Sequence, residues 1–201
     1  MAGLRSTLGL IFLMTAALVF GETNSPSPSP VPAGAAEGPV PCSFGSLPSD
    51  VQNSLKSELA TWKVQEPENL SEYTRKTWAG KKPPGCPGIA VGLFQNARVP
   101  SYAVLLVPVD HRDVGFRLVV FSRNVGESSY EATVVERSGD RASKYFIRKV
   151  PISGYFSEVS KRKFQVEATE AILMVDSAED EYEADIYFWS NRHFRQKPVD
   201  D

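Results

Sequence analysis

Short runs of strand-forming residues dominate the chain beyond position 88. Five runs rich in Val, Ile, Tyr and Phe alternate with Gly, Asp, Asn and Pro: Ile89–Phe94, Tyr102–Pro108, Phe116–Ser122, Tyr130–Glu136 and Tyr145–Val150. Because the loops between them are short, we expect successive strands to pair as antiparallel hairpins. Four later segments continue the pattern: 162–168, 171–176, 183–189 and 192–198. The short "SNR" between the last two predicts a closing hairpin.

The segment before these strands has helical periodicity. Its apolar residues, spaced by four, four and three, are Val51, Leu55, Leu59 and Trp62. This spacing places all four on one face of a helix, and Ser49 with Gln52 fits a capping box at its start. A second short helix is predicted over 70–79. We therefore predict an α+β fold, with N-terminal helices packed on a mainly antiparallel sheet of about 6–9 strands.

The first residues predict export. Arg5 precedes an apolar run from Leu8 to Phe20, and Gly21 fits a cleavage position, so residues 1–21 are predicted to be a signal peptide. The run is shorter than the roughly 20 residues of a membrane-spanning helix, which makes a permanent anchor the weaker alternative. Residues 22–41 are rich in Pro and Ser, typical of a disordered linker. Residues 42–201 are predicted to form one α+β domain, exported to the periplasm or the extracellular space.

The charge of the chain is nearly balanced. Removal of residues 1–21 takes away one Arg from 22 cationic residues and none of the 24 acidic ones, which leaves a net charge of about −3. Such a balance argues against nucleic acid or an anionic membrane as the main partner. We expect the partner to be a protein or a glycan component of the envelope instead.

Two cysteines in an exported chain most simply pair with each other. We predict a Cys42–Cys86 disulfide that fastens the helical part to the sheet. A reactive thiol is the alternative, although neither cysteine has a histidine near it in sequence.

The stretch Gly92–Val104, "GLFQNARVPSYAV", resembles a single degenerate repeat of the FG-GAP or VCBS type, G-D-F-N-G-D-G-x-x-D-apolar-A-V. The matching residues are Gly92, Phe94, Pro100, Ala103 and Val104. In that family the loop presents oxygen ligands to Ca²⁺. The carboxylate positions of the pattern are held here by Leu93, Gln95, Ala97 and Ser101. We therefore expect no calcium at residues 92–104.

A wider resemblance covers most of the chain after the leader. The order of "LP", a helix, "PGIAVGLF", "YAVLLV" and a terminal "IYFWSNRHF" is similar to exported bacterial proteins of unknown function. This resemblance implies a fold but no reaction.

Candidate catalytic groups are few. His111 and Arg112, in "VDHRDVG" between two predicted strands, lie beside Asp110 and Asp113, which suits either an acid–base cluster or a solvated loop. His193 is the only other histidine, and two isolated histidines predict no metal site. The G-x-S-x-G frame of serine hydrolases and the glycine-rich phosphate loops are absent. We expect no cofactor.

Two charged segments and one aromatic pair remain. The run 176–185, "DSAEDEYEAD", suits a loose cation site or paired acids, but a solvated turn is favoured. The cations of "SKRKF", Lys161 to Lys163, suit one wall of an anion-binding face or an ordinary charged loop. Strand alternation places Tyr187 and Trp189 on one face of a strand, where an uncovered sheet would expose them to a protein or glycan partner.

These features support a non-catalytic binding or interaction domain, with Tyr187, Trp189, His111 and Arg112 as the predicted binding residues. One alternative is a small extracytoplasmic hydrolase that uses His111 with carboxylates of the acidic run. Another is a structural accessory domain of the envelope. Convergence of His111, Asp113 and the acidic run in one cleft would favour the hydrolase, whereas an open aromatic patch would favour binding.

Overall fold

The computed structural model describes residues 42–58, 60–80, 85–110, 113–178 and 181–199. The predicted signal peptide and linker lie outside this part. The described residues form three α-helices, α1 (Ser49–Glu58), α2 (Glu72–Ala79) and α3 (Glu158–Phe164). They also form nine strands: β1 (Trp62–Val64), β2 (Ile89–Gly92), β3 (Ser101–Pro108), β4 (Phe116–Ser122), β5 (Glu131–Ser138), β6 (Tyr145–Pro151), β7 (Glu170–Ala178), β8 (Glu181–Ser190) and β9 (His193–Pro198).

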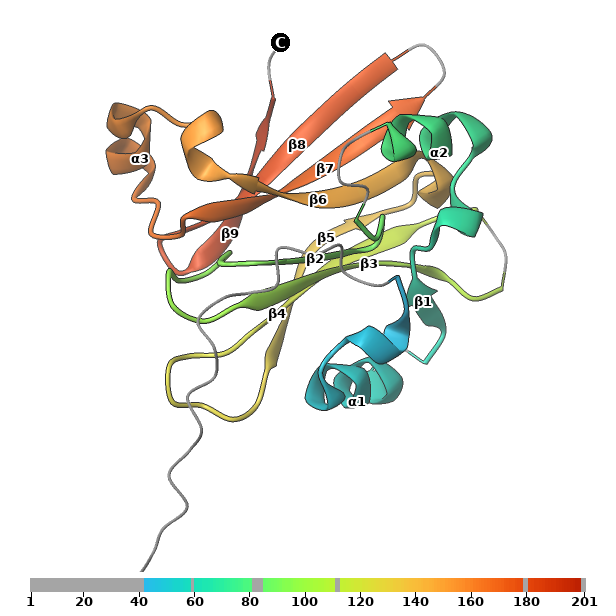
Figure 1. Cartoon of the computed structure of the whole chain (residues 1–201), viewed down its shortest axis with the longest axis horizontal. Coiled ribbons are helices and arrows are strands. Elements are labelled where there is room, and N and C mark those ends of the chain that lie inside the picture. The colour runs from blue at the N-terminus through green and yellow to red at the C-terminus, as the bar shows by residue number, and fades with distance from the viewer. Residues whose placement is uncertain (1–41, 59, 81–84, 111–112, 179–180, 200–201) are drawn as a thin grey trace, which may run out of the picture. The chain divides into compact units, whose positions relative to one another are not determined.

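The strands form two antiparallel sheets (Figure 1). In the first sheet β3 lies at the centre: β4 and then β5 follow on one side, while β1 and β2 pair with different halves of β3 on the other. The second sheet has the order β6-β7-β8-β9. The α+β class and the antiparallel pairing are confirmed, but the strands are divided between two sheets rather than one.

The main core lies between the sheets. Alternate residues of the central strands meet there, among them Leu105 on β3, Leu118 on β4, Ile147 on β6 and Ile172 on β7. Each of these side chains is at most 1% exposed. The strands form two layers because each sheet has one apolar face, and packing these two faces together removes both from water.

The outer faces of both sheets are also covered. Val51 and Leu55 of α1 pack on Leu106 and Phe121 of the first sheet. On the second sheet Phe156 and Phe164, from the segment that contains α3, pack against Phe188. Figure 1 shows α1 below the first sheet, α3 to the left of the second sheet and α2 to its right. Burial on both faces explains the unbroken apolar run "AVLLV" in β3.

Two helix boundaries differ from the predictions. The first helix ends at Glu58, and Trp62 lies in β1, opposite Pro108 of β3. Strand pairing with β3 therefore overrides the helical spacing. Gln52 forms no capping box, because its side-chain amide donates to the Leu47 carbonyl at 2.7 Å.

The predicted strand over 162–168 is wrong at its start, because residues 158–164 form α3. The hydroxyl of Ser157 accepts the backbone N–H of Ser160 at 3.2 Å and caps this helix. Gln165, with a φ of 50°, ends it in the left-handed conformation. The predicted closing hairpin is confirmed: Asn191 and Arg192 both have positive φ between β8 and β9.

A buried glutamine, Gln65, joins the two sheets. Its backbone N–H donates to Leu105 of the first sheet at 2.8 Å. Its side-chain amide donates to the carbonyls of Ala142, at 2.8 Å, and Tyr145, at 3.1 Å, at the start of the second sheet. Gln65 is fully buried, so these bonds form away from water.

The predicted disulfide is present and lies against the same residue. Cys42 is bonded to Cys86, and both sulfur atoms lie 3.8 Å from the Gln65 carbonyl oxygen. The bridge ties the chain before α1 to the start of β2, beside the junction of the two sheets.

We expect removal of the disulfide to destabilise the fold. The bridge closes a loop with a sequence separation of 44, for which the chain-entropy model gives about 4 kcal/mol. The double variant Cys42→Ser, Cys86→Ser should lose most of this free energy of unfolding in denaturant titrations. Equal stability of the variant and the oxidised wild type would contradict this role.

A substitution at Gly88 provides a second test of this junction between the sheets. A Cβ atom at Gly88 would lie 2.3 Å from the Gln65 carbonyl oxygen, whereas a Cβ at Gly85 would meet nothing within 4 Å. We expect Gly88→Ala to cost about 3 kcal/mol, because backbone atoms must move apart. Gly85→Ala is the matched control and should leave the thermal midpoint nearly unchanged. A similar effect of both variants would show that close approach to Gln65 is unimportant.

Candidate functional site

Two hollows in the surface of the first sheet meet at Trp62. One, of about 380 Å³, lies between α1 and β1, with Leu55 and Lys56 among its lining residues. The other, of about 800 Å³, lies between β1 and the end of β3 and reaches Val114. Ala60 and Trp62 line both. The indole therefore lies at the border between the two hollows.

Strand pairing and one glycine position this indole. Trp62 pairs with Pro108, which brings the residues after β3 to its side. Gly115 has a φ of +87°, and a Cβ on it would lie 4.0 Å from the indole and 3.3 Å from the Ser138 carbonyl. A residue with a side chain is strained at this φ, so glycine lets the chain enter β4 beside the indole.

Arg117 of β4 lies over the ring of Trp62. Its guanidinium carbon is 4.5 Å from the ring centroid, which is the geometry of a cation–π contact. This contact restrains both side chains and leaves a positive charge next to the aromatic ring.

The rim of the larger hollow is apolar and open to solvent. Val109 is 46% exposed and Val114 is 61% exposed. Together with Ala60, Pro108 and Trp62 they form what we call the Trp62 surface. Large aliphatic side chains that are exposed side by side mark an interaction site more often than isolated ones do.

The segment that suits either an acid–base cluster or a solvated loop, with the predicted binding residues His111 and Arg112, is only partly described. His111 and Arg112 lie outside the described residues. Asp113 is committed to the backbone: one carboxylate oxygen accepts the Ser143 N–H at 2.7 Å, and the other accepts the Ser143 hydroxyl at 2.5 Å. It thus holds the turn before β6, which is a structural task.

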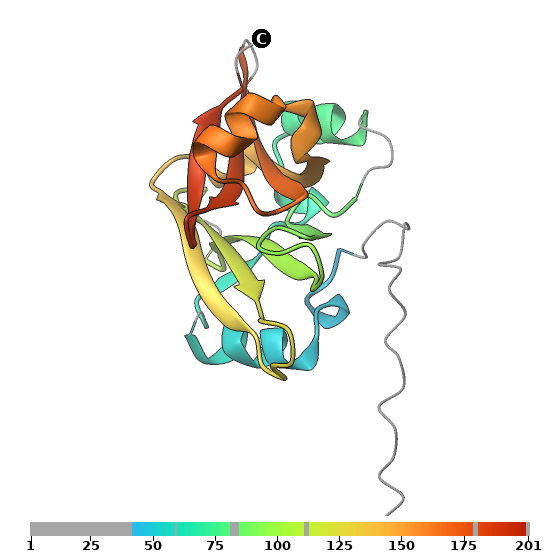
Figure 2. The ribbon, with the colours of Figure 1, turned by 90° about the vertical axis from the view of Figure 1, so that its left-hand side faces the viewer.

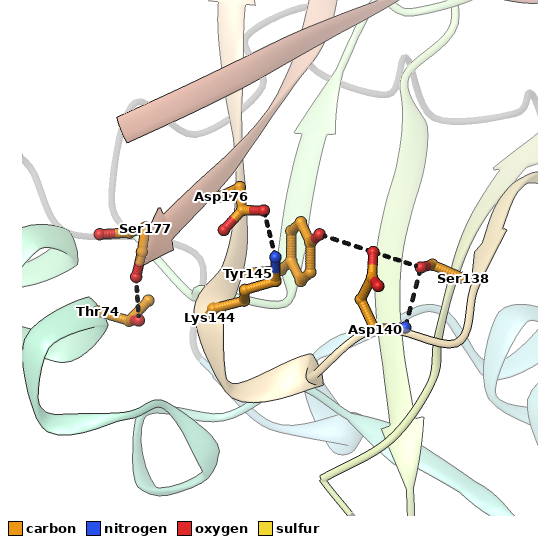
Figure 3. A network of polar contacts seen from close by, with 7 residues as sticks. All are labelled: Thr74, Ser138, Asp140, Lys144, Tyr145, Asp176 and Ser177. Atoms are coloured by element: carbon orange, nitrogen blue, oxygen red, sulfur yellow. Dashed lines mark hydrogen bonds and ion pairs between the residues drawn. The ribbon is translucent and has the colours of Figure 1, made fainter. Parts of the chain in front are cut away.

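The acidic run lies mostly on strands rather than in a solvated turn. Asp176 is in β7, partly buried, and opposite Glu183 of β8. Its carboxylate accepts from Lys144 at 2.6 Å. Figure 3 shows this ion pair beside Tyr145. The pairing neutralises Asp176 where water has little access.

Tyr145 completes this polar network. Its hydroxyl donates to Asp140 at 3.2 Å, and Asp140 also accepts from the Ser138 hydroxyl at 2.9 Å (Figure 3). Burial, together with the nearby carboxylates of Asp176 and Asp140, raises the pKa of Tyr145 far above its usual value. A tyrosine that keeps its proton is a hydrogen-bond donor and not a base or nucleophile. The network therefore holds the start of β6 in place, which is a structural role.

The predicted aromatic patch is not open. Tyr187 is 1% exposed and lies in the core between the sheets. Trp189 is partly buried and packs edge-on against Phe194 of β9, with ring centroids 5.0 Å apart. The inner face of β8 is covered by the first sheet, which the sequence pattern alone does not reveal.

The Trp62 surface was missed from the sequence because Trp62 fits the helical spacing of α1. The only signal in its favour is the strand-like "TWKV" after α1. Val109 and Val114 lie in loop positions, where aliphatic residues carry no periodicity.

Within residues 42–199, apart from the gaps given above, no three His, Cys, Asp or Glu side chains are grouped as metal ligands. In the same part of the chain no helix is long and apolar enough to cross a membrane. Comparison with known family models, curated proteins and solved structures finds no match to this chain.

The buried tyrosines predict sensitivity to alkali. Burial also raises the pKa of Tyr187, with further effects from Glu136 and Asp185. A raised folded-state pKa means that the stabilising contribution is complete below about pH 10 and is lost as the pH rises further. We expect the free energy of unfolding to fall above that pH by about 1.4 kcal/mol per pH unit for each buried tyrosine.

The free energy of unfolding is measured by denaturant titration at a series of alkaline pH values. Tyrosinate absorbance, recorded in parallel, reports the ionisation of the tyrosines. Tyr145→Phe should flatten the pH dependence. Tyr73→Phe is the control, because Tyr73 is 42% exposed and lies outside the buried network. If Tyr145→Phe and Tyr73→Phe showed the same pH dependence as the wild type, the buried network would not be the cause.

Proposed function

We propose that this chain is an exported, non-catalytic binding domain that holds a protein partner on the Trp62 surface. The observation that carries the proposal is the meeting of two hollows at one indole, with exposed valines on the rim. Export is supported by the Cys42–Cys86 bridge, because disulfides persist in oxidising compartments.

A protein partner fits this surface better than a glycan does. The larger hollow is lined mainly by aliphatic groups, with Thr61 and Asp110 as its polar side chains. Sugars need several directed hydrogen bonds, whereas an apolar protein side chain gains free energy from burial alone. The pair of Trp62 and Arg117 adds the two residue types that most often dominate the energetics of protein interfaces.

Charge supports a partner segment with acidic neighbours. Lys56 and Lys63 line the smaller hollow with Glu66 as the acidic residue, and Arg117 lies over the indole. An apolar anchor flanked by Asp or Glu would place carboxylates near these cations and would gain in association rate as well as in specificity.

Catalysis is less well supported, because the carboxylates predicted to act are engaged in structural contacts. Asp113 is bound by Ser143, and Asp176 is paired with Lys144. The hydrolase hypothesis rested on free carboxylates converging on His111, and these two are not free.

The test compares two exposed valines. Full-length protein is immobilised and incubated with envelope extract of its source organism, with wild type, Val114→Asp and Val125→Asp in parallel. Val114 is 61% exposed and Val125 is 65% exposed, in the turn between β4 and β5. We expect one partner to be retained by wild type and Val125→Asp and lost by Val114→Asp.

Affinity measurement with the purified partner completes the test. Trp62→Ala should weaken binding roughly 30-fold, as expected of an interface hot spot worth about 2 kcal/mol. Circular dichroism checks that each variant is folded. Retention of the partner by Val114→Asp at wild-type affinity would refute the proposed surface, and the absence of any partner would favour a purely structural domain.

A further inference from the structure

A second surface lies on the opposite side of the molecule. It consists of Arg162 and Lys163 of α3, Arg192 of the β8–β9 turn, and Arg195 and Lys197 of β9. We call these five residues the basic face. They come from two segments about thirty residues apart, which the fold brings together.

The register of the second sheet places the β9 cations on its outer face. Arg195 lies opposite Phe188, and Lys197 lies opposite Ile186. Phe188 and Ile186 belong to the apolar cluster that packs under the α3 segment. Because opposed residues of an antiparallel pair share a face, both cations emerge on the face that carries α3. Figure 2 shows this segment, in orange, in front of the red strands.

Aromatic rings bridge the two groups of cations. The Lys163 ammonium lies 5.9 Å from the Phe164 ring centroid, and the Lys197 ammonium lies 6.0 Å from that of Phe156. The rings of Phe156 and Phe164 are themselves 5.9 Å apart. Lys163 and Lys197 therefore flank one pair of rings, with cation–π contacts that favour these positions.

The solvent-facing side of α3 adds an apolar residue to the cations. Val159, Arg162 and Lys163 have the spacing i, i+3 and i+4, which places them on one face of the helix. All three are exposed, and Val159 is 78% exposed. On an anionic lipid surface this valine would enter the headgroup region while the two cations contact the headgroups.

The charges of this face are only partly balanced locally, because Glu158 on α3 is attracted by Arg162 as well as by Lys161. Lys161 pairs with Glu158 at 2.7 Å. Within the part of the chain that the structure describes, no carboxylate lies within 4.0 Å of the charged nitrogens of the basic face. The net charge of −2 for the whole chain conceals this concentration of cations.

We propose that the basic face docks on an anionic lipid surface, with Val159 entering the headgroup region. Soluble polyanions would satisfy the cations but would leave Val159 exposed, whereas a lipid surface accommodates both. The Trp62 surface adjoins α1 on the outer face of the first sheet, whereas the basic face adjoins α3 on the outer face of the second sheet. A domain docked in this manner presents Trp62 away from the membrane.

The experiment is co-sedimentation of the full-length protein with vesicles. One set is phosphatidylcholine alone, and the other contains about a third phosphatidylglycerol. The readout is the ratio of the two partition coefficients, so that any binding common to both sets cancels. We expect a ratio well above one that falls as salt is added. The double variant Arg162→Glu, Lys163→Glu should lower the ratio at least ~30-fold, because the loss of each cation alone costs about fivefold and the new carboxylates add repulsion.

A matched double variant controls for net charge. Arg98→Glu, Arg141→Glu changes the same charge at two exposed positions outside the basic face and should keep the wild-type ratio. Val159→Ser should weaken binding without a change in charge. Equal loss in both double variants would overturn the proposal, and so would an unchanged Val159→Ser combined with tight binding to a soluble polyanion such as heparin. A ratio near one for the wild type would overturn it directly.

Discussion

The fold depends on the buried amide of Gln65. Its backbone is bonded to Leu105 of the first sheet, and its side chain binds two carbonyls where the second sheet begins. The two carbonyls satisfy the side-chain N–H groups of Gln65, whereas its Oε1 has no hydrogen-bond partner. Because a buried donor without a partner costs free energy, the two N–H bonds favour one way of stacking the sheets. The Cys42–Cys86 bridge and the close approach of Gly88 enclose the same residue. These contacts restrain the chain between α1 and β3 relative to the second sheet.

Both proposed surfaces are consequences of this stacking. The sheets pack against each other through their most apolar sides. Both proposed surfaces therefore lie on the outer faces of the sheets. On the first, α1 packs on the sheet, and Trp62 lies beside it at the border of two hollows. On the second, the α3 segment covers the sheet, and its own exposed face joins the cations of β9. A partner on one side and a lipid surface on the other do not compete for residues.

Local patterns predicted the strands well and the helix ends less well. Phe116–Ser122 agrees with β4 at both ends, and the remaining early runs differ from their strands by one or two residues. Trp62 was placed in α1 because its spacing from Val51 and Leu55 is helical, and only pairing with β3 makes it a strand residue. The start of α3 was missed because Ser157 was not recognised as a cap. Tyr187 was one of the predicted binding residues on the condition that its sheet face were uncovered, and both faces of its strand are covered.

The amino-acid sequence by itself determined the α+β class, the antiparallel pairing and the cysteine partnership, because these follow from periodicity, short loops and the number of cysteines. Only the tertiary structure decided that there are two sheets, that Asp113 and Asp176 serve as anchors, and that Trp62 borders a concave surface. It also decided where charge is concentrated. Net charge is a sum over the chain, whereas an electrostatic surface depends on which distant residues become neighbours, and strand register and helix packing set those neighbours.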